Sequence, residues 1–162
     1  MIVYSQRCRE AFKDVPIIIG GIEASLRRIA HYDYWSDKVR RSILLDSKAD
    51  MLVYGNAERQ VVVLAHSLSN VENINELKDF RVTAFIQDVF PEDWAELDSS
   101  PLEEPGSISI KTRKEVERSR IYIRIPSYAQ VKKDQNLYAH ASRMLHLETN
   151  PGNARVLVQK HG

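Results

Sequence analysis

Two apolar segments that end in glycine turns constrain the fold of this chain more than any other feature. The first, Ile17–Ile19, leads into Gly20-Gly21, and the second, Met51–Tyr54, leads into Gly55-Asn56 and the start of a helix. Short apolar runs with β-branched residues on both faces are typical of buried parallel strands. Open α/β sheets bind ligands at the carboxyl ends of such strands. The pair therefore predicts a parallel sheet with a ligand-binding edge.

Helical patterns surround these two strands. Residues Tyr4, Cys8 and Phe12 recur at every fourth position, which predicts a helix over Ile2–Phe12 with a buried, inert Cys8. Ser36 is a good N-cap, and Trp35, Val39 and Ile43 repeat with the same spacing, which predicts a helix from Asp37 to about Ser47. A third helical stripe follows the second strand, and its members are Ala57, Val61, Leu64, Ala65 and Leu68.

The second half of the chain is less regular, and we expect it to complete one α/β domain over residues 1–162. A surface loop or insertion is expected at about 88–114, because the first part of this stretch is rich in proline and acidic residues. A long helix is expected to begin at Pro126-Ser127 and to end before Asn150-Pro151-Gly152. The expected strands are Val82–Ile86, Ile108–Ile110, Ile121–Ile125 and Arg155–Gln159.

Composition excludes several classes of protein. Lysine plus arginine number 23 against 22 aspartate plus glutamate, so no global field attracts nucleic acid or anionic lipid. No apolar run approaches the roughly 18 to 20 residues of a membrane span. Cys8 is the only cysteine, which excludes an internal disulfide or a cysteine-only metal cage within one copy. The start of the chain lacks the features of a signal peptide, so we expect a cytoplasmic protein.

The two turns, Gly20–Ser25 and Gly55–Glu58, are the first candidate site. Adjacent glycines let the backbone approach a ligand closely, and Asn56 can cap the following helix. Glu58 lies in the first turn of that helix, where the helix dipole favours a carboxylate. The alternative is a tight connection from strand to helix without a ligand. Neither GxGxxG nor a P-loop lysine is present, so no motif supports nucleotide binding.

A second candidate site mixes basic and aromatic side chains between residues 27 and 35. This combination can stack bases or clamp phosphates, as in binding to RNA. In the alternative, the aromatic rings pack against the sheet, and the arginines pair with Glu23, Asp33 and Asp37. The candidate residues for an anionic ligand are Arg27, Arg28, His31, Tyr34 and Trp35.

No catalytic or metal-binding motif stands out. The five histidines have neither the spacing nor the neighbouring ligands of a metal site, and GxSxG is absent. We therefore expect no metal ligand and no catalytic residue in this chain.

Long and unusual strings carry a resemblance to a known family. The segment GGIEASLRRIAHYDYWSDKVRRSILLDSKADMLVYGNAE and the tail LYAHASRMLHLETNPGNARVLVQKHG closely resemble the N-terminal region of the YgiQ-type radical SAM proteins. The resemblance covers nearly the whole chain, except Asp88–Lys114. It implies a Rossmann-like three-layer sandwich, similar to cobalamin-binding domains, with a mainly parallel sheet that is incomplete on its N-terminal side.

The resemblance also implies a function. In this family a radical SAM barrel, expected to be absent from this chain, holds a [4Fe–4S] cluster on a CxxxCxxC motif and cleaves S-adenosylmethionine. This chain would be the accessory domain and inactive alone, with the missing barrel as its partner. By this likeness, the residues that face the barrel or a ligand are Gly20, Gly21, Glu23, Ser25, Gly55, Asn56 and Glu58. The DxHxxG signature for cobalamin is absent, which argues against that cofactor.

Two alternatives to the accessory domain stay open. The first is a small module that grips RNA or another anionic partner through Arg27–Trp35. The second is an interaction domain that associates through an unpaired sheet edge.

Overall fold

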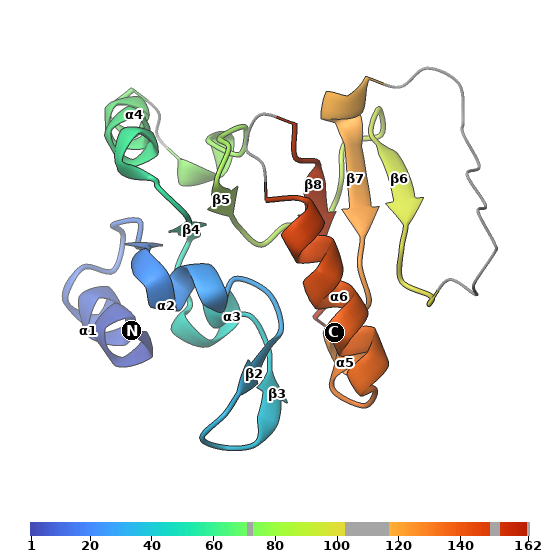
Figure 1. Ribbon diagram of the computed structural model, residues 1–162. Coiled ribbons are helices and arrows are strands. Elements are labelled where there is room, and N and C mark those ends of the chain that lie inside the picture. The colour runs from blue at the N-terminus through green and yellow to red at the C-terminus, as the bar shows by residue number, and fades with distance from the viewer. Residues whose placement is uncertain (71–72, 103–116, 150–152, 162) are drawn as a thin grey trace. The chain divides into compact units, whose positions relative to one another are not determined.

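The computed structural model of this chain describes residues 1–70, 73–102, 117–149 and 153–161. They form two compact units, an N-terminal unit of Met1–His31 with Arg41–Asp88 and a C-terminal unit of Tyr32–Arg40 with Val89–Gly162. Helices and strands alternate along both, which confirms a mixed α/β fold (Figure 1). The expectation of one domain over residues 1–162 stays a prediction.

A three-stranded sheet forms the centre of the N-terminal unit. Strands β1 (Ile18–Ile19) and β4 (Met51–Val53) run parallel, as the apolar segments predict. Strand β5 (Thr83–Ala84) lies on the other side of β4 and runs antiparallel to it. The expected strand at 82–86 is therefore confirmed, and the direction of its pairing makes this sheet mixed.

Helices cover both faces of this sheet, because side chains alternate between the faces along each strand. Ile19 and Leu52 pack against α2 (Gly21–Leu26) and α3 (Ile43–Ser47). Met51 and Val53 pack on the opposite side against Leu64 of α4 (Glu58–Leu68) and the short 3-10 helix η1 (Ile74–Glu76) (Figure 1).

Helix α1 (Ile2–Ala11) forms where expected but presents a different face to the unit. Tyr4 and Phe12 are largely exposed, and Cys8 is exposed, so the prediction of a buried thiol is wrong. The buried position is Ser5. Arg9 sets the orientation, since its guanidinium contacts the Asp50 carboxylate at 2.5 Å and the Val15 carbonyl at 2.9 Å.

The predicted helix from Asp37 to Ser47 is wrong in its first half. A hairpin of β2 (His31–Asp33) and β3 (Lys38–Arg40) occupies the region, and only α3 is helical. Asp37 has φ 51° in the hairpin turn. Helix α3 begins after Ser42, whose side chain accepts a hydrogen bond from the Leu44 amide at 3.3 Å.

The C-terminal unit contains a parallel sheet of β6 (Ala95–Asp98), β7 (Ile121–Arg124) and β8 (Val156–Val158). Strands β7 and β8 were expected. Strand β6 was not, because it lies inside the range predicted as loop or insertion at 88–114. Residues 103–114 of that range, with the strand predicted at 108–110, lie outside the described residues.

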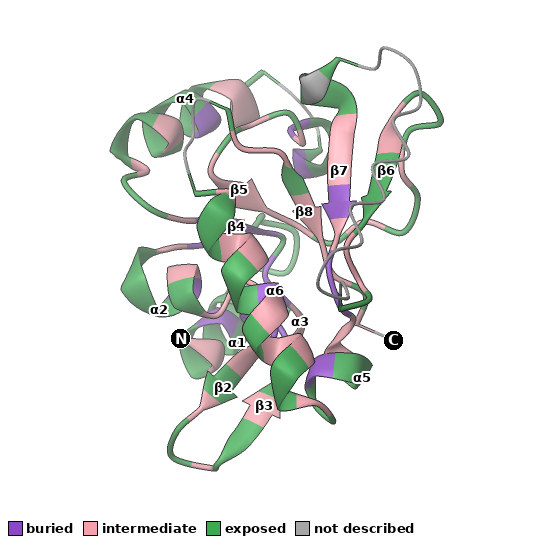
Figure 2. Ribbon diagram, turned by 45° about the vertical axis from the view of Figure 1, so that its right-hand side comes forward, coloured by how far each residue is buried: buried purple, intermediate pink, exposed green. Residues whose placement is uncertain are grey.

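The long C-terminal helix is divided in two. Helix α5 (Tyr128–Val131) begins with a capping box between Ser127 and Gln130, and Asp134 caps a new helix, α6 (Gln135–Leu147). The 3-10 turn η2 (Arg118–Arg120) precedes β7. Buried side chains of Ile123, Val131 and Ala141 form part of the core of this unit (Figure 2).

Candidate functional site

The two glycine turns lie at the same edge of the first sheet. Strand β1 pairs in parallel with β4, with Ile18 opposite Met51 and Ile19 opposite Leu52. The carboxyl ends of both strands therefore point the same way, and the predicted juxtaposition of the turns is confirmed. Whether this edge binds a ligand stays a prediction.

The Ser25 hydroxyl joins the two turns directly. Its oxygen accepts a hydrogen bond from the Gly55 amide at 3.3 Å and donates to the Gly21 carbonyl at 2.8 Å. One side chain on α2 thus fixes the turn after β4 against the turn after β1. We call this arrangement of Gly20, Gly21, Ser25 and Gly55 the glycine edge.

At each of the three glycine positions of the edge, the local structure explains why the residue is glycine. Gly21 and Gly55 have φ of +84° and +66°, a backbone conformation that L-residues with a side chain rarely adopt. Gly20 has extended backbone, but a Cβ there would lie 2.9 Å from Cγ2 of Val53. The space where a Cβ would stand at Gly21 and Gly55 is open within 4 Å.

A partly buried cation lies beside the glycine edge. The Arg28 guanidinium is 4.5 Å from the centroid of the Tyr54 ring and donates to the Ser25 carbonyl. Burial lowers the pKa of Arg28 from its ordinary value of 12.5, and Tyr54 opposes this shift. Arginine keeps its charge at neutral pH even so. Arg28 therefore connects the two candidate sites, and Tyr54 is a contact that the sequence patterns did not single out.

The three polar candidates at the edge are exposed. Glu23 pairs with Arg27 at 3.2 Å across one turn of helix. Asn56 does not cap α4, because Ala57 holds the N-cap position without a side-chain hydrogen bond, so the capping prediction is wrong. Glu58 is the first residue of α4, as predicted. All three carry polar groups that a partner could reach.

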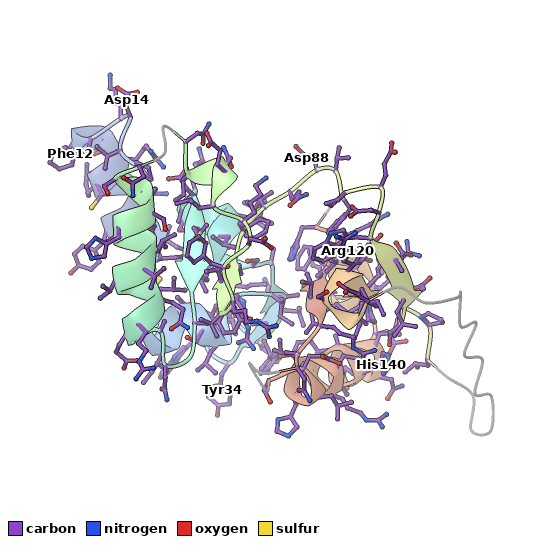
Figure 3. The ribbon with its side chains drawn as sticks, turned by 90° about the horizontal axis from the view of Figure 1, so that it is seen from above. Phe12, Asp14, Tyr34, Asp88, Arg120 and His140 are labelled. Atoms are coloured by element: carbon purple, nitrogen blue, oxygen red, sulfur yellow. The ribbon has the colours of Figure 1, made fainter. Side chains whose placement is uncertain are left out.

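The basic and aromatic segment is divided between the two units. Arg27, Arg28 and His31 belong to the N-terminal unit, whereas Tyr34 and Trp35 lie at the tip of the β2–β3 hairpin in the C-terminal unit. The alternative, in which the aromatic rings pack on the sheet, is wrong for Tyr34 and Trp35, because they are 80% and 92% exposed. Its pairing of Arg27 with Glu23 is confirmed. Figure 3 shows Tyr34 pointing away from the ribbon.

Asp33 organises the hairpin. Its carboxylate accepts hydrogen bonds from the Ser36 hydroxyl at 2.7 Å, Arg40 Nε at 2.6 Å and the Trp35 amide at 3.2 Å. The bonds from Ser36 and then Arg40 lower the pKa of Asp33 from 3.8 to about 2. Asp33 is therefore ionised at neutral pH and stabilises the turn through these hydrogen bonds.

Sequence reasoning missed a polar cluster on the parallel sheet of the C-terminal unit. Arg124 Nη2 lies 2.7 Å from Glu96 Oε1 and 2.7 Å from Asp98 Oδ2, and the Tyr122 hydroxyl donates to Glu96 at 2.7 Å. Burial, and then the Glu96 carboxylate, raise the pKa of Tyr122 to about 12. The pairing register places Glu96 opposite Tyr122 and Asp98 opposite Arg124, so this cluster joins β6 to β7.

His140 on α6 adds a contact to the same region. Its Nε2 lies 2.9 Å from the Ser99 carbonyl and 3.0 Å from the Ser99 hydroxyl (Figure 3). A carbonyl only accepts, so Nε2 carries a proton and donates to it. A protonated Nε2 cannot take the proton of the Ser99 hydroxyl, so this geometry is not that of an activated nucleophile.

The described residues do not fit a metal cluster. The [4Fe–4S] cluster that the resemblance implies would need three cysteines, and the sequence has only Cys8. Within the part of the chain that the structure describes, no three His, Cys, Asp or Glu side chains gather to hold a metal ion. In the same ranges no helix is long and apolar enough to cross a membrane.

Comparison with known proteins decides the family. A family model described as "Radical SAM N-terminal" matches residues 1–162. The chain belongs to the Radical SAM N-terminal family. The resemblance that the strings around GGIEAS carry is thereby confirmed.

Several proteins with similar sequences are UPF0313 proteins. A UPF0313 protein of Rhodopseudomonas palustris is 58% identical over 161 residues, which cover 99% of this chain and 23% of the relative. A UPF0313 protein of Pseudomonas putida is 49% identical, and UPF0313 protein YgiQ of Escherichia coli K12 is 48% identical. The chain spans about a quarter of the length of these relatives. No solved structure matches it significantly.

Proposed function

We propose that this Radical SAM N-terminal domain is an accessory domain of a radical SAM enzyme and does not catalyse alone. One observation carries the proposal: the family model described as "Radical SAM N-terminal" matches residues 1–162. The length of similar relatives, which are about four times as long as this chain, supports it. In the full-length protein, a [4Fe–4S] cluster would cleave S-adenosylmethionine. Since Cys8 is the only cysteine here, that cluster would be held by residues outside this chain.

The finer fold is part of the proposal. A Rossmann-like three-layer sandwich, similar to a cobalamin-binding domain, is supported by the parallel pairing of β1 with β4 and by helices on both faces of their sheet. Strand β1 has one partner among the described residues, β4, although its isoleucines resemble those of interior strands. This supports a sheet that continues past β1 with strands from outside this chain.

The glycine edge is the proposed contact with the rest of the polypeptide or with a ligand held between them. The open space at the Cβ positions of Gly21 and Gly55 and the exposed side chains of Glu23, Asn56 and Glu58 support this role. Cobalamin is not proposed, because its DxHxxG signature is absent from the sequence. A cytoplasmic location is proposed together with the enzyme.

Anaerobic reconstitution with iron and sulfide tests this function. The full-length protein should gain the absorbance and iron content of a [4Fe–4S] cluster, whereas residues 1–162 alone should gain neither. A stoichiometric cluster on the isolated chain, or none on the full-length protein, would overturn the proposal.

Binding of RNA through residues 27–35 remains a second candidate. The exposed Tyr34 and Trp35 favour it, because bases stack on such rings. Filter binding at low and moderate salt tests it, since phosphate contacts make affinity fall steeply with salt. Absence of binding at low salt would remove this candidate.

A further inference from the structure

The tip of the β2–β3 hairpin exposes two large aromatic side chains. Tyr34 and Trp35 are 80% and 92% exposed, and their rings meet edge to face with centroids 6.2 Å apart. When a partner covers them, aromatic side chains bury about 150–250 Å² each. Tyrosine and tryptophan are also the residues that most often dominate the energy of an interface.

The hairpin holds this pair in place through bonds that do not use either ring. Asp33 binds Ser36 and Arg40 across the turn, and the Tyr32 hydroxyl donates to the Asp37 carboxylate. At the base, the Tyr138 hydroxyl of α6 accepts a hydrogen bond from the Tyr32 amide at 3.0 Å. A contact surface that is already ordered loses less entropy when it binds.

On the hairpin itself, the aromatic rings are the largest groups left for a partner. Arg40 is paired with Asp33 at 2.6 Å, and Lys38 at the start of β3 is an exposed cation. Two exposed rings beside one exposed cation favour an apolar partner over a phosphate backbone.

We propose that Tyr34 and Trp35 dock into an apolar pocket on the part of the same polypeptide that lies outside this chain. The inference rests on the proposed function, which places this domain in a longer protein. The chain spans 26% of the Pseudomonas putida relative and 23% of the Rhodopseudomonas palustris relative, so about three quarters of such a polypeptide is available as the partner. We call Tyr34 and Trp35 the docking tip.

Photocrosslinking in the full-length, reconstituted protein tests the docking tip. Trp35 is replaced by the photoreactive residue p-benzoylphenylalanine, and crosslinked peptides are identified by mass spectrometry. Lys133, an exposed residue between α5 and α6, is replaced in the same way as the matched control. We expect position 35 to crosslink to one discrete peptide beyond residue 162 of the same molecule, and position 133 not to crosslink to that peptide.

A second variant checks that the contact depends on the rings. The Tyr34 side chain is 80% exposed in this chain, so Tyr34→Ala should leave the circular dichroism spectrum of the chain unchanged. In full-length protein that carries the photoreactive group at position 35, Tyr34→Ala should reduce the yield of the specific crosslink severalfold. An unchanged yield would contradict docking by the pair.

The outcomes separate this inference from the function on which it rests. Crosslinks to a second copy, to copurified RNA or to no discrete peptide, in a protein that carries its cluster, would overturn the docking tip alone. A discrete crosslink beyond residue 162 in a protein that gains no cluster after reconstitution would support docking and overturn the proposed enzyme.

Discussion

Ser25 is the residue on which the glycine edge depends most. Its hydroxyl accepts a hydrogen bond from the Gly55 amide and donates one to the Gly21 carbonyl. It thereby joins the two turns that were predicted to meet. Removing the hydroxyl in Ser25→Ala leaves both groups without that partner. We expect a loss of about 1 kcal/mol in the free energy of unfolding, measured with urea.

The matched control for this substitution is Ser142→Ala on the exposed side of α6. It should change the free energy of unfolding by no more than about 0.5 kcal/mol. Equal effects of the two substitutions would show that Ser25 does not join the turns.

Gly55 tests the backbone requirement separately from the hydroxyl. Its φ of +66° is left-handed, so Gly55→Ala should destabilise the unit by about 1–2 kcal/mol. Gly55→Asn should cost less, because asparagine tolerates this conformation better than alanine does. Thermal unfolding of both variants would measure their relative stabilities. A Gly55→Ala variant as stable as Gly55→Asn would contradict this prediction.

At the scale of the elements, the β2–β3 hairpin should respond to acid. Asp33 has a pKa of about 2 against an ordinary 3.8, so its carboxylate stabilises the folded hairpin above about pH 4. That contribution is lost as the pH falls through about 2. Carboxyl chemical shifts of Asp33, followed by NMR between pH 5 and 1.5, should show this low midpoint.

Two substitutions identify the cause of the low pKa. Ser36→Ala removes the largest contribution and Arg40→Met the next, so each should move the Asp33 midpoint upward towards 3.8. A midpoint that stays near 2 in both variants would mean that these hydrogen bonds do not set it.

The hairpin also shows why sequence patterns misplace some elements. Trp35, Val39 and Ile43 are spaced by four, and this spacing fits one face of a helix as well as one face of a strand. The choice between them was made by Asp33, which closes a turn through Ser36 and Arg40. A carboxylate in a tight turn gives no periodic signal.

Helix α1 shows that sequence patterns can also fail to predict which face of a helix is buried. The apolar stripe through Tyr4 and Phe12 predicts which residues form a helix, but Arg9 decides which face turns inward by pairing with Asp50. That contact joins residues 41 positions apart. The cluster of Arg124, Glu96 and Asp98 was missed for the same reason, since it depends on the register between β6 and β7.

At the scale of the whole molecule, local sequence patterns predicted the structure correctly where each strand is followed by a glycine turn. The parallel pairing of β1 with β4 and the meeting of their turns were predicted from apolar runs followed by glycine. The family was recognised from long strings and confirmed over residues 1–162. The activity could not be read from the sequence, because about three quarters of such a polypeptide lies outside this chain.

The central claim is that this domain assists radical chemistry whose cluster is held elsewhere in the polypeptide. The most direct measurement is the formation of 5′-deoxyadenosine from S-adenosylmethionine by reduced, reconstituted full-length protein carrying Cys8→Ser. Since Cys8 is exposed on α1 and is the only cysteine of this chain, we predict the same yield as from the unsubstituted protein. Loss of the cluster and of 5′-deoxyadenosine on Cys8→Ser would contradict the account.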